Sequence, residues 1–348
     1  MNIENLTLLF PQIIIAALGI LTPLLQPKNL LFGVRLSKIL SEKKTVATVK
    51  KKYLISSSLL FFLWILMTNL LKLPNSTIIA GEIVLLFGFY GFYNRKVKNW
   101  KELQYKNDPQ MKPKNPTLLF DTDFRNQKLY FGGIWYALPI ALIVVQLVVN
   151  FINRKIVIND NSIFSSVALL CSTNILLTVL IFFQNSIIKN VKQQISATNP
   201  EISKEQNITF RKRWSLFLFM LFNFIIAMNL IFNLQLLKIL TNFTFMTQQI
   251  YMSGIIIFVI ATVLMALLIG QSGSRLKIDK KKSDSKYDDV DDDLYWKAGI
   301  FYYNPEDPSL WIEKRMGIGW TINFGNKKSW IFILLLAISI SYSLFKTN

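Results

Sequence analysis

Residues 251–271 read Tyr-Met-Ser-Gly-Ile-Ile-Ile-Phe-Val-Ile-Ala-Thr-Val-Leu-Met-Ala-Leu-Leu-Ile-Gly-Gln, an uncharged apolar run. A helix needs about 20 such residues to cross a bilayer. Seven further runs of this kind occur, and the last is the shortest. We therefore predict an all-α integral membrane protein with about eight transmembrane helices, at 6–26, 54–71, 77–94, 129–151, 163–186, 214–237, 251–271 and 330–345.

The composition of the 348 residues agrees with this class. The chain is 52% hydrophobic, yet it carries 39 Lys and Arg against 20 Asp and Glu, a net charge of +19. Such a chain fits a membrane protein with charged loops, so we expect a lipid bilayer and no nucleic acid as partner. The chain has no histidine and one cysteine, Cys171. This excludes histidine-dependent triads, histidine metal sites and internal disulfides, and we predict no catalytic, cofactor-binding or metal-binding residues.

The positions of the basic residues predict the orientation. The segments 27–53, 95–128, 187–213 and 272–329 hold 34 of the 39 Lys and Arg, and the remaining five are spread over the other side. Lys and Arg accumulate in the cytoplasmic loops of membrane proteins. We therefore expect a multi-pass protein of the cell membrane whose four basic segments are cytoplasmic and whose termini are both extracytoplasmic.

Polar residues inside the predicted spans are the first candidates for function. Glu82 is the one ionisable residue there, about six residues from the outer end of its span. It either reaches the headgroups or has a buried partner or ligand. The uncharged polar residues serve either as hydrogen-bonding contacts between helices or as a polar substrate path; they are Gln146, Asn150, Asn174, Gln184, Asn223, Asn229, Asn233 and Gln235.

The first basic segment predicts an interfacial helix. Ser41 is a plausible N-cap, and Val46, Val49 and Tyr53 then share one helical face beside a lysine-rich one. The lysines orient the chain, and anionic lipid at the cytoplasmic face is a possible additional partner.

The region before the last span divides into two parts. Residues 272–293 form a charged linker, with a basic stretch followed by Asp288-Asp-Val-Asp-Asp-Asp293. The spacing of a calcium-binding EF-hand is absent, so we expect a solvated, self-neutralising segment. Residues 294–329 alternate β-prone stretches (300–303, 310–314 and 320–324) with Pro- and Gly-rich turns, which predicts a small cytoplasmic β-hairpin module. The preceding residues 1–271 form the helical membrane domain.

Three stretches of the sequence carry a resemblance to a known group of proteins. Tyr302-Tyr-Asn-Pro-Glu-Asp-Pro308 and Gly317-Ile-Gly-Trp-Thr-Ile-Asn-Phe-Gly325 resemble a short C-terminal domain of unknown function in multi-span membrane proteins of Gram-positive bacteria. Phe32-Gly-Val-Arg35 resembles the first cytoplasmic segment of the same proteins. Many of them are allied to the Sdp-type immunity family, whose members protect a toxin producer and can signal the toxin. Those relatives usually carry a Pro-x-His-Trp motif in an outer loop, whereas residues 151–160 here contain neither His nor Trp.

These observations lead to a non-enzymatic sensor or immunity component that responds to a peptide toxin or envelope stress. The alternative is a transporter or permease component for a small polar or lipid-like substrate. Candidate outer ligand contacts are Glu82, Arg154, Lys155 and Asp160. Candidate contacts of the β module with a cytoplasmic protein partner are Asn304, Asp307, Glu313, Lys314, Arg315 and Trp320.

Overall fold

The computed structural model describes residues 3–71, 73–113, 116–117, 133–193, 195–240, 244–278 and 288–334. The chain forms two compact units, each assembled from separate stretches of sequence. Unit 1 comprises Met1–Asp121, Val191–Asn207 and Ala266–Asn348, and unit 2 comprises Thr122–Asn190 and Ile208–Met265.

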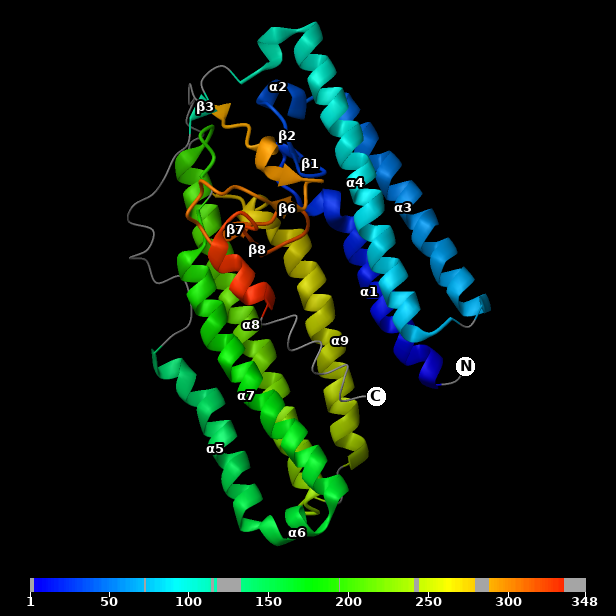
Figure 1. Cartoon of the computed structure of the whole chain (residues 1–348), viewed down its shortest axis with the longest axis vertical. Helices are drawn as coiled ribbons and strands as arrows, with labels where there is room; N and C mark the ends of the chain where they lie inside the picture. Colours follow the sequence, from blue (N-terminus) through cyan, green and yellow to red (C-terminus); the bar gives the residue numbers. More distant parts are fainter. Residues whose placement is uncertain are drawn as a thin grey trace. The chain divides into compact units, whose positions relative to one another are not determined.

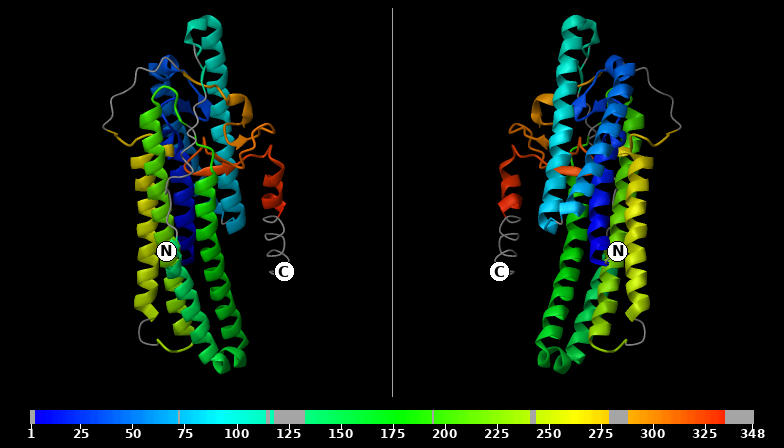
Figure 2. Two further views of the ribbon diagram at one scale, coloured as in Figure 1. Left: turned by 90° about the vertical axis from the view of Figure 1, so that its left-hand side faces the viewer. Right: turned by 90° about the vertical axis from the view of Figure 1, so that its right-hand side faces the viewer.

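Three helices form the frame of unit 1: α1 (Ile3–Leu25), α3 (Lys44–Leu71) and α4 (Asn75–Asn107). They lie side by side, with α3 antiparallel to the other two (Figures 1 and 2). Close approach depends on small residues, because Gly19 of α1 faces Phe61 and Leu86 across the bundle. The hydroxyl of Tyr53 donates to the carbonyl of Gly19 at 2.9 Å, which fixes α3 against α1.

A hairpin links α1 to α3 and inserts into the bundle. Its strands are β1 (Leu30–Leu31) and β2 (Val34–Arg35), which pair antiparallel and are followed by α2 (Lys38–Ser41). Phe32 at the hairpin tip is fully buried between the rings of Tyr53 and Tyr93, with centroids 4.7 and 5.1 Å away. This aromatic cluster is the core of unit 1 where the hairpin meets the helices.

The first basic segment differs from the interfacial helix that the sequence predicts. Ser37 rather than Ser41 is the N-cap, and it caps α2. The face of Val46 and Tyr53 packs into the aromatic core of unit 1, with Val49 at its edge. An apolar helical face has the same sequence pattern whether protein or lipid covers it. Here other side chains of unit 1 cover it.

Four short strands form the C-terminal β module: β5 (Trp296–Lys297), β6 (Phe301–Tyr302), β7 (Trp311–Glu313) and β8 (Trp320–Ile322). They make two antiparallel pairs, β5 with β6 and β7 with β8, and a bridge from Tyr302 to Asn323 joins the pairs. The three β-prone stretches of the sequence are confirmed as β6, β7 and β8. Before the module, β4 (Asp288–Asp289) pairs in parallel with β3 (Pro116–Thr117).

The described secondary structure of unit 2 consists of helices. It contains the 3-10 turn η3 (Gly133–Tyr136), α5 (Ala137–Ile152), α6 (Arg154–Asn159), α7 (Asn161–Asn190) and most of α8 (Pro200–Leu236) and α9 (Thr244–Ile269). Ile181, Phe219 and Ile226 form one of its buried clusters. The first turns of α8 and the end of α9 belong to unit 1.

Six described helices are long and apolar enough to cross a membrane: Lys44–Leu71, Thr77–Asn107, Gly133–Ile152, Asn161–Asn190, Pro200–Leu236 and Phe245–Gly273. They correspond to six of the eight predicted spans, so the count of eight is not confirmed among the described residues. In α1 the apolar helix found is the shorter Gln12–Leu25. The predicted span at 330–345 lies largely outside the described residues.

Candidate functional site

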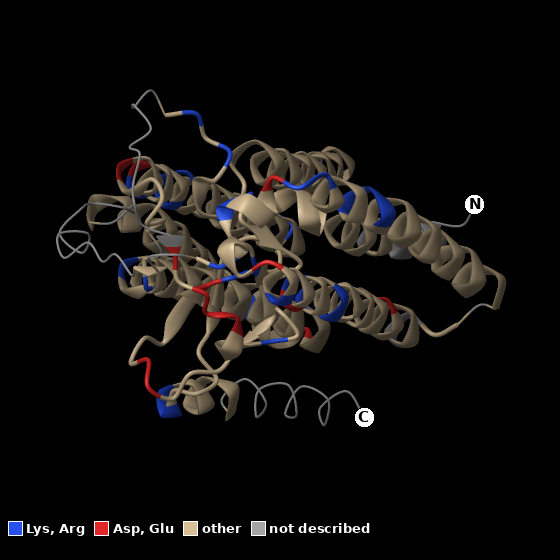
Figure 3. Cartoon of the chain, turned by 90° about the horizontal axis from the view of Figure 1, so that it is seen from above, with Lys and Arg blue, Asp and Glu red and all other residues tan. Residues whose placement is uncertain are grey.

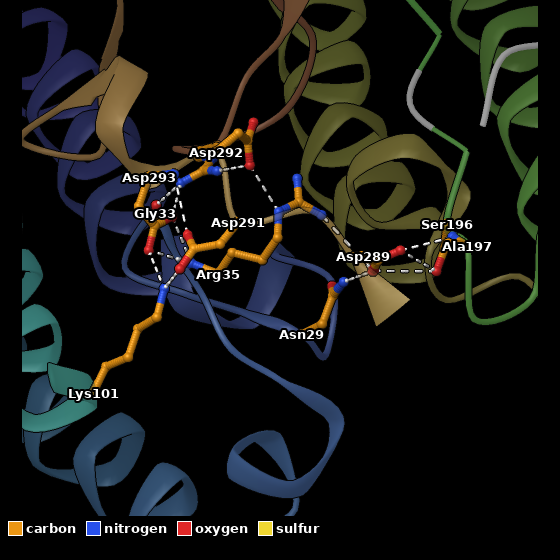
Figure 4. Close-up of polar contacts among 11 residues, drawn as sticks. Asn29, Gly33, Arg35, Lys101, Ser196, Ala197, Asp289, Asp291, Asp292 and Asp293 are labelled. Atoms are coloured by element: carbon orange, nitrogen blue, oxygen red, sulfur yellow. Dashed lines mark hydrogen bonds and ion pairs between the residues drawn. The ribbon is translucent and has the colours of Figure 1, made fainter. Parts of the chain in front are cut away.

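A network of partly buried ion pairs connects the β module of unit 1 to its helices (Figure 4). Its first cation is Arg35, on β2. The Nε atom of Arg35 lies 2.9 Å from a carboxylate oxygen of Asp292, and its guanidinium also approaches Asp289 at 3.8 Å. The backbone N–H of Arg35 donates to Asp293 at 2.9 Å. We call residues 288–293 the acidic stretch. The hairpin between α1 and α3 is therefore bound to the acidic stretch through both the side chain and the main chain of Arg35.

The second cation is Lys101, near the end of α4. Its ammonium group lies 2.5 Å from Asp291 and 2.7 Å from Asp293. The side chain is buried, so its long stem is held in one arrangement by two carboxylates. This pair ties α4 to the same acidic stretch that binds Arg35.

The third cation, Arg315, follows β7 and is only 2% exposed. Its guanidinium lies 2.5 Å from Asp293 and also pairs with Asp292. It donates to the carbonyl of Gly33, and it stacks over the ring of Trp296 with 5.0 Å between guanidinium carbon and ring centroid. Arg315 thus contacts the acidic stretch, the β1–β2 hairpin and β5 at once.

Asp289 extends the network to a third part of the chain. One of its oxygens accepts from the side-chain amide of Asn29 at 2.6 Å. The other accepts from the backbone N–H of Ala197 at 2.7 Å and from the hydroxyl of Ser196 at 3.0 Å. All three sequence segments of unit 1 therefore meet at these aspartates. A cavity of about 50 Å³ is lined in part by Asn29, Arg35 and Arg315, which bind these aspartates.

The electrostatics of the network favour the charged forms of its aspartates. Burial alone would raise the pKa of Asp292, but Arg35 and Arg315 outweigh it and hold that pKa well below its usual range. Burial likewise opposes the charge of Asp293, and Arg315 and Lys101 lower its pKa on balance. For Arg35, the attraction of Asp292 and Asp289 exceeds the cost of burial, so its pKa is raised.

The acidic stretch differs from the solvated, self-neutralising segment expected from the sequence. In its described part, the aspartates pair with Arg35, Lys101 and Arg315, which all lie outside the segment. Figure 3 draws the acidic residues of the chain red and the basic residues blue. Charge alternation along a sequence cannot show which opposite charges will meet in space. The basic stretch 279–286 lies outside the described residues.

The six candidate contacts of the β module occupy different environments. Asn304, Asp307, Glu313 and Arg315 are buried, whereas Lys314 is exposed and Trp320 half-buried. Asp307 accepts from Lys192 at 2.6 Å and from the hydroxyl of Tyr302 at 2.9 Å. Glu313 accepts from the side chains of Asn207, at 2.5 Å, and Ser272. The described bonds of these residues hold the module together and attach it to the rest of unit 1.

The four candidate outer contacts fall into separate units. Arg154, Lys155 and Asp160 lie in or directly after α6 of unit 2 and are exposed. Glu82 lies on α4 of unit 1 and is fully buried, and neither of its carboxylate oxygens has a hydrogen-bond partner among the described residues. Of the two readings of Glu82, burial favours the second, in which the side chain stays inside the bundle.

The polar side chains of unit 2 bind one another. Asn174 on α7 donates to Gln146 on α5 and accepts from Asn229 on α8, both at 2.8 Å. One turn along α8, Asn233 donates to Asn150 at 2.7 Å. These bonds join three helices, which favours the role of contacts between helices over a polar path.

Sequence reasoning missed Arg35, Lys101 and the aspartates as one site. One signal was available: Phe32-Gly-Val-Arg35 and the C-terminal motif carried the same resemblance. Arg315, which lies between the two C-terminal stretches of that resemblance, donates to the carbonyl of Gly33.

The comparisons with known proteins concern the C-terminal module. Residues 305–330, which include β7 and β8, match the model of a family of unknown function, DUF5808. No curated protein and no solved structure matches the chain. The expected C-terminal domain of unknown function is therefore confirmed, and the comparisons give no support to the Sdp-type likeness. The chain thus carries, in the part that contains Arg315, a segment similar to a family of unknown function.

Proposed function

We propose that this chain is a non-enzymatic sensor or immunity component of the cell membrane that responds to a peptide toxin or to envelope stress. One observation carries the proposal. Arg315, inside the segment that matches the family of unknown function, pairs with Asp293, and Asp293 also binds Lys101 on α4. A ligand that shifts α4 relative to its neighbours would change the contacts that hold the module. The ion-pair network is then the link between membrane and module.

The ligand would be met on the outer side and the response delivered on the inner side. The exposed charges of Arg154, Lys155 and Asp160 suit contact with a charged peptide. Lys314 and Trp320 are the module side chains best placed for a cytoplasmic protein partner, since the other candidates are buried. The resemblance to immunity-allied membrane proteins supports the same reading.

The test is a susceptibility measurement. A strain that lacks the gene should be more sensitive to secreted antimicrobial peptides, and wild-type chain should restore resistance. The Asp293→Asn variant weakens the ion-pair network and should restore resistance poorly. The Glu306→Gln variant changes an exposed residue of the same module and should restore resistance fully. Immunoblots of the membrane fraction must show equal amounts of each variant. Unchanged susceptibility across a broad peptide panel would contradict the proposal.

We also propose that both termini lie outside the cell and that the β module is cytoplasmic. The 34-to-5 distribution of Lys and Arg supports this orientation. Fusions of alkaline phosphatase and of green fluorescent protein after residue 113 and after residue 160 test it. We expect fluorescence for the first position and phosphatase activity for the second, and the reverse pattern would overturn the orientation.

The transporter alternative requires a polar path through the helices. The polar side chains on α5, α7 and α8 of unit 2 could form such a path. However, Asn174, Asn229 and Gln146 are buried and hydrogen-bonded to one another. This pairing favours the sensor or immunity reading.

A further inference from the structure

The β5–β6 hairpin exposes aromatic side chains on one face. Alternation along a strand turns Tyr302 inward, where it is 4% exposed, and its two neighbours outward. Phe301 is 47% and Tyr303 48% exposed. The ring of Phe301 contacts that of Phe324 at 5.6 Å, and the indole N–H of Trp330 donates to the carbonyl of Phe324. We call Phe301, Tyr303, Phe324 and Trp330 the aromatic face.

Exposed basic residues accompany the aromatic face. Lys297 is the register partner of Phe301 across the hairpin. Lys327 and Lys328, three and two residues before Trp330, are also exposed. Aromatic rings next to lysines suit one environment in particular, the headgroup layer of an anionic membrane, where rings occupy the interface and ammonium groups meet lipid phosphates.

The hairpin also lies at the level where α4 changes from apolar to basic. A side chain on Gly91 of α4 would lie 3.9 Å from Ala298 at the hairpin tip, and one on Gly299 would meet Asn94 at 2.5 Å. Gly91 and Asn94 fall in the last turn of the apolar run 77–94, and Arg95 begins the basic part. The hairpin tip is therefore adjacent to the expected boundary between membrane and water.

The sequence after the β module gives an independent indication of the same boundary between membrane and water. Trp330, which is 51% exposed, stands at the start of the apolar run 330–345, and Ile331 beside it is also exposed. A tryptophan at the entry of an apolar run is typical of the interface.

We propose that the aromatic face lies in the headgroup layer of the bilayer, on the side of the basic segments, and that Lys297, Lys327 and Lys328 bind anionic lipid there. The occupant of this face is the membrane in which the chain itself is embedded. The β module then rests on two supports, the ion-pair network from within unit 1 and the lipid surface below. This inference does not depend on the sensor or immunity role.

The single cysteine of the chain makes a direct test possible. With Cys171→Ser as background, a spin label is attached in separate variants at Phe301→Cys, Tyr303→Cys and, as control, Glu102→Cys on the basic part of α4. Each full-length variant is placed in nanodiscs of neutral lipid or of neutral plus anionic lipid. Collision rates with oxygen, which dissolves in lipid, and with a water-soluble nickel complex are measured by electron paramagnetic resonance.

We expect the oxygen-to-nickel ratio at positions 301 and 303 to exceed that at position 102 several-fold, and to rise further with anionic lipid. Equal ratios at all three positions would overturn the proposal, and the face would then suit docking of a protein instead. The Lys327→Gln, Lys328→Gln double variant should abolish the added effect of anionic lipid.

A second measurement needs no substitution in the face. Unmodified protein in the same nanodiscs is treated with a water-soluble amine acylating reagent, and labelling is read by mass spectrometry. Lys327 and Lys328 should be labelled several-fold more slowly in anionic than in neutral nanodiscs, whereas the exposed Lys106 of α4 should change little. Equal labelling of Lys327 and Lys328 in both lipids would overturn the role of the lysines.

Discussion

At the scale of single residues, Arg315 has the most demanding environment of the network. It is almost fully buried and satisfies two carboxylates, a carbonyl and an aromatic ring. A buried ion pair gains little over a well-packed apolar pair, because desolvation offsets the attraction, but losing one partner leaves buried charge behind. Arg315 therefore contributes less to net stability than to specificity, because it favours one arrangement of the segments that it joins.

Replacement of Arg315 by Met should therefore destabilise the protein by about 3 kcal/mol, since Asp292 and Asp293 lose a shared cation inside the fold. Denaturant unfolding in detergent, followed by tryptophan fluorescence, measures the change. The neighbouring Lys314→Met variant is the matched control, because that side chain is exposed and should cost less than about 0.5 kcal/mol. Equal effects of the two substitutions would contradict the importance of the network.

The lowered pKa values of Asp292 and Asp293 predict how stability depends on pH. A carboxylate whose pKa is lower in the folded than in the unfolded state stabilises the fold above the unfolded pKa of about 3.9, and this contribution is lost as pH falls through the folded pKa. Proteolytic protection of residues 288–334 should thus stay constant from about pH 7 to pH 5 and decline below about pH 4. Asp293→Asn should show a shallower decline. A midpoint near pH 6 in the wild type would be inconsistent with these aspartates as the cause.

At the scale of elements, two hairpins from opposite ends of the chain meet tip to tip. Gly33 and Gly299 both have positive φ, +76° and +69°, and their backbones are in contact. The side-chain amide of Asn94 donates to the carbonyl of Phe32 at 2.7 Å and closes the junction from α4. Only a residue without Cβ fits at this contact, so the junction excludes any substitution at either glycine without rearrangement.

Gly299→Ala should be more harmful than Gly317→Ala, although both glycines have similar φ values, +69° and +74°. The two alanines share a strain of about 1–2 kcal/mol in the left-handed region. At position 299 the new Cβ also meets the carbonyl of Phe32 at 2.7 Å, whereas nothing lies within 4 Å at position 317. We expect an additional loss of about 1–3 kcal/mol for the first variant, read from the same denaturant unfolding. A difference near zero would mean that the two hairpins do not pack as described.

Local patterns in the sequence predicted the helices and strands, but they could not predict contacts between distant residues. The apolar runs gave six helices that could span a membrane, and alternation with turn residues gave β6, β7 and β8. β5 was missed because Trp296 and Lys297 alone cannot show alternation. The pairing of Arg35 with Asp292 joins residues 257 positions apart, and the sequence offers several cations for each aspartate. The charge pattern of the sequence therefore indicates which residues can form ion pairs, but it does not indicate which of them pair with each other.

At the scale of the whole molecule, unit 1 closes only when the last part of the chain joins the first. The aromatic core around Phe32 and the cations Arg35 and Lys101 come from the first third of the sequence, and the aspartates follow much later. Unit 2 is assembled from the intervening stretches and contains none of these groups. The two units should therefore respond differently to the loss of the C-terminal segment.

A chain that ends at residue 278 should lose protection in unit 1 and retain it in unit 2. Arg35 and Lys101 then lack their carboxylates, so amide hydrogen exchange at 26–37 should accelerate several-fold. Exchange at 170–185 on α7, where Asn174 and Ile181 are buried, serves as the internal control and should remain unchanged. Equal acceleration at both places, or none at either, would contradict this division.

The separation of Arg35 from Asp292 by 257 positions also has a consequence for synthesis. A ribosome that adds about 5–20 residues per second needs roughly 13–50 s to make that stretch. During this interval the aspartates that later bind the early cations have not yet been made. Lys and Arg orient spans during insertion, and acidic residues contribute little. Under the proposed orientation, the same side chains act twice, first as bare charges that guide the nascent chain and later as ion-pair partners in the finished fold.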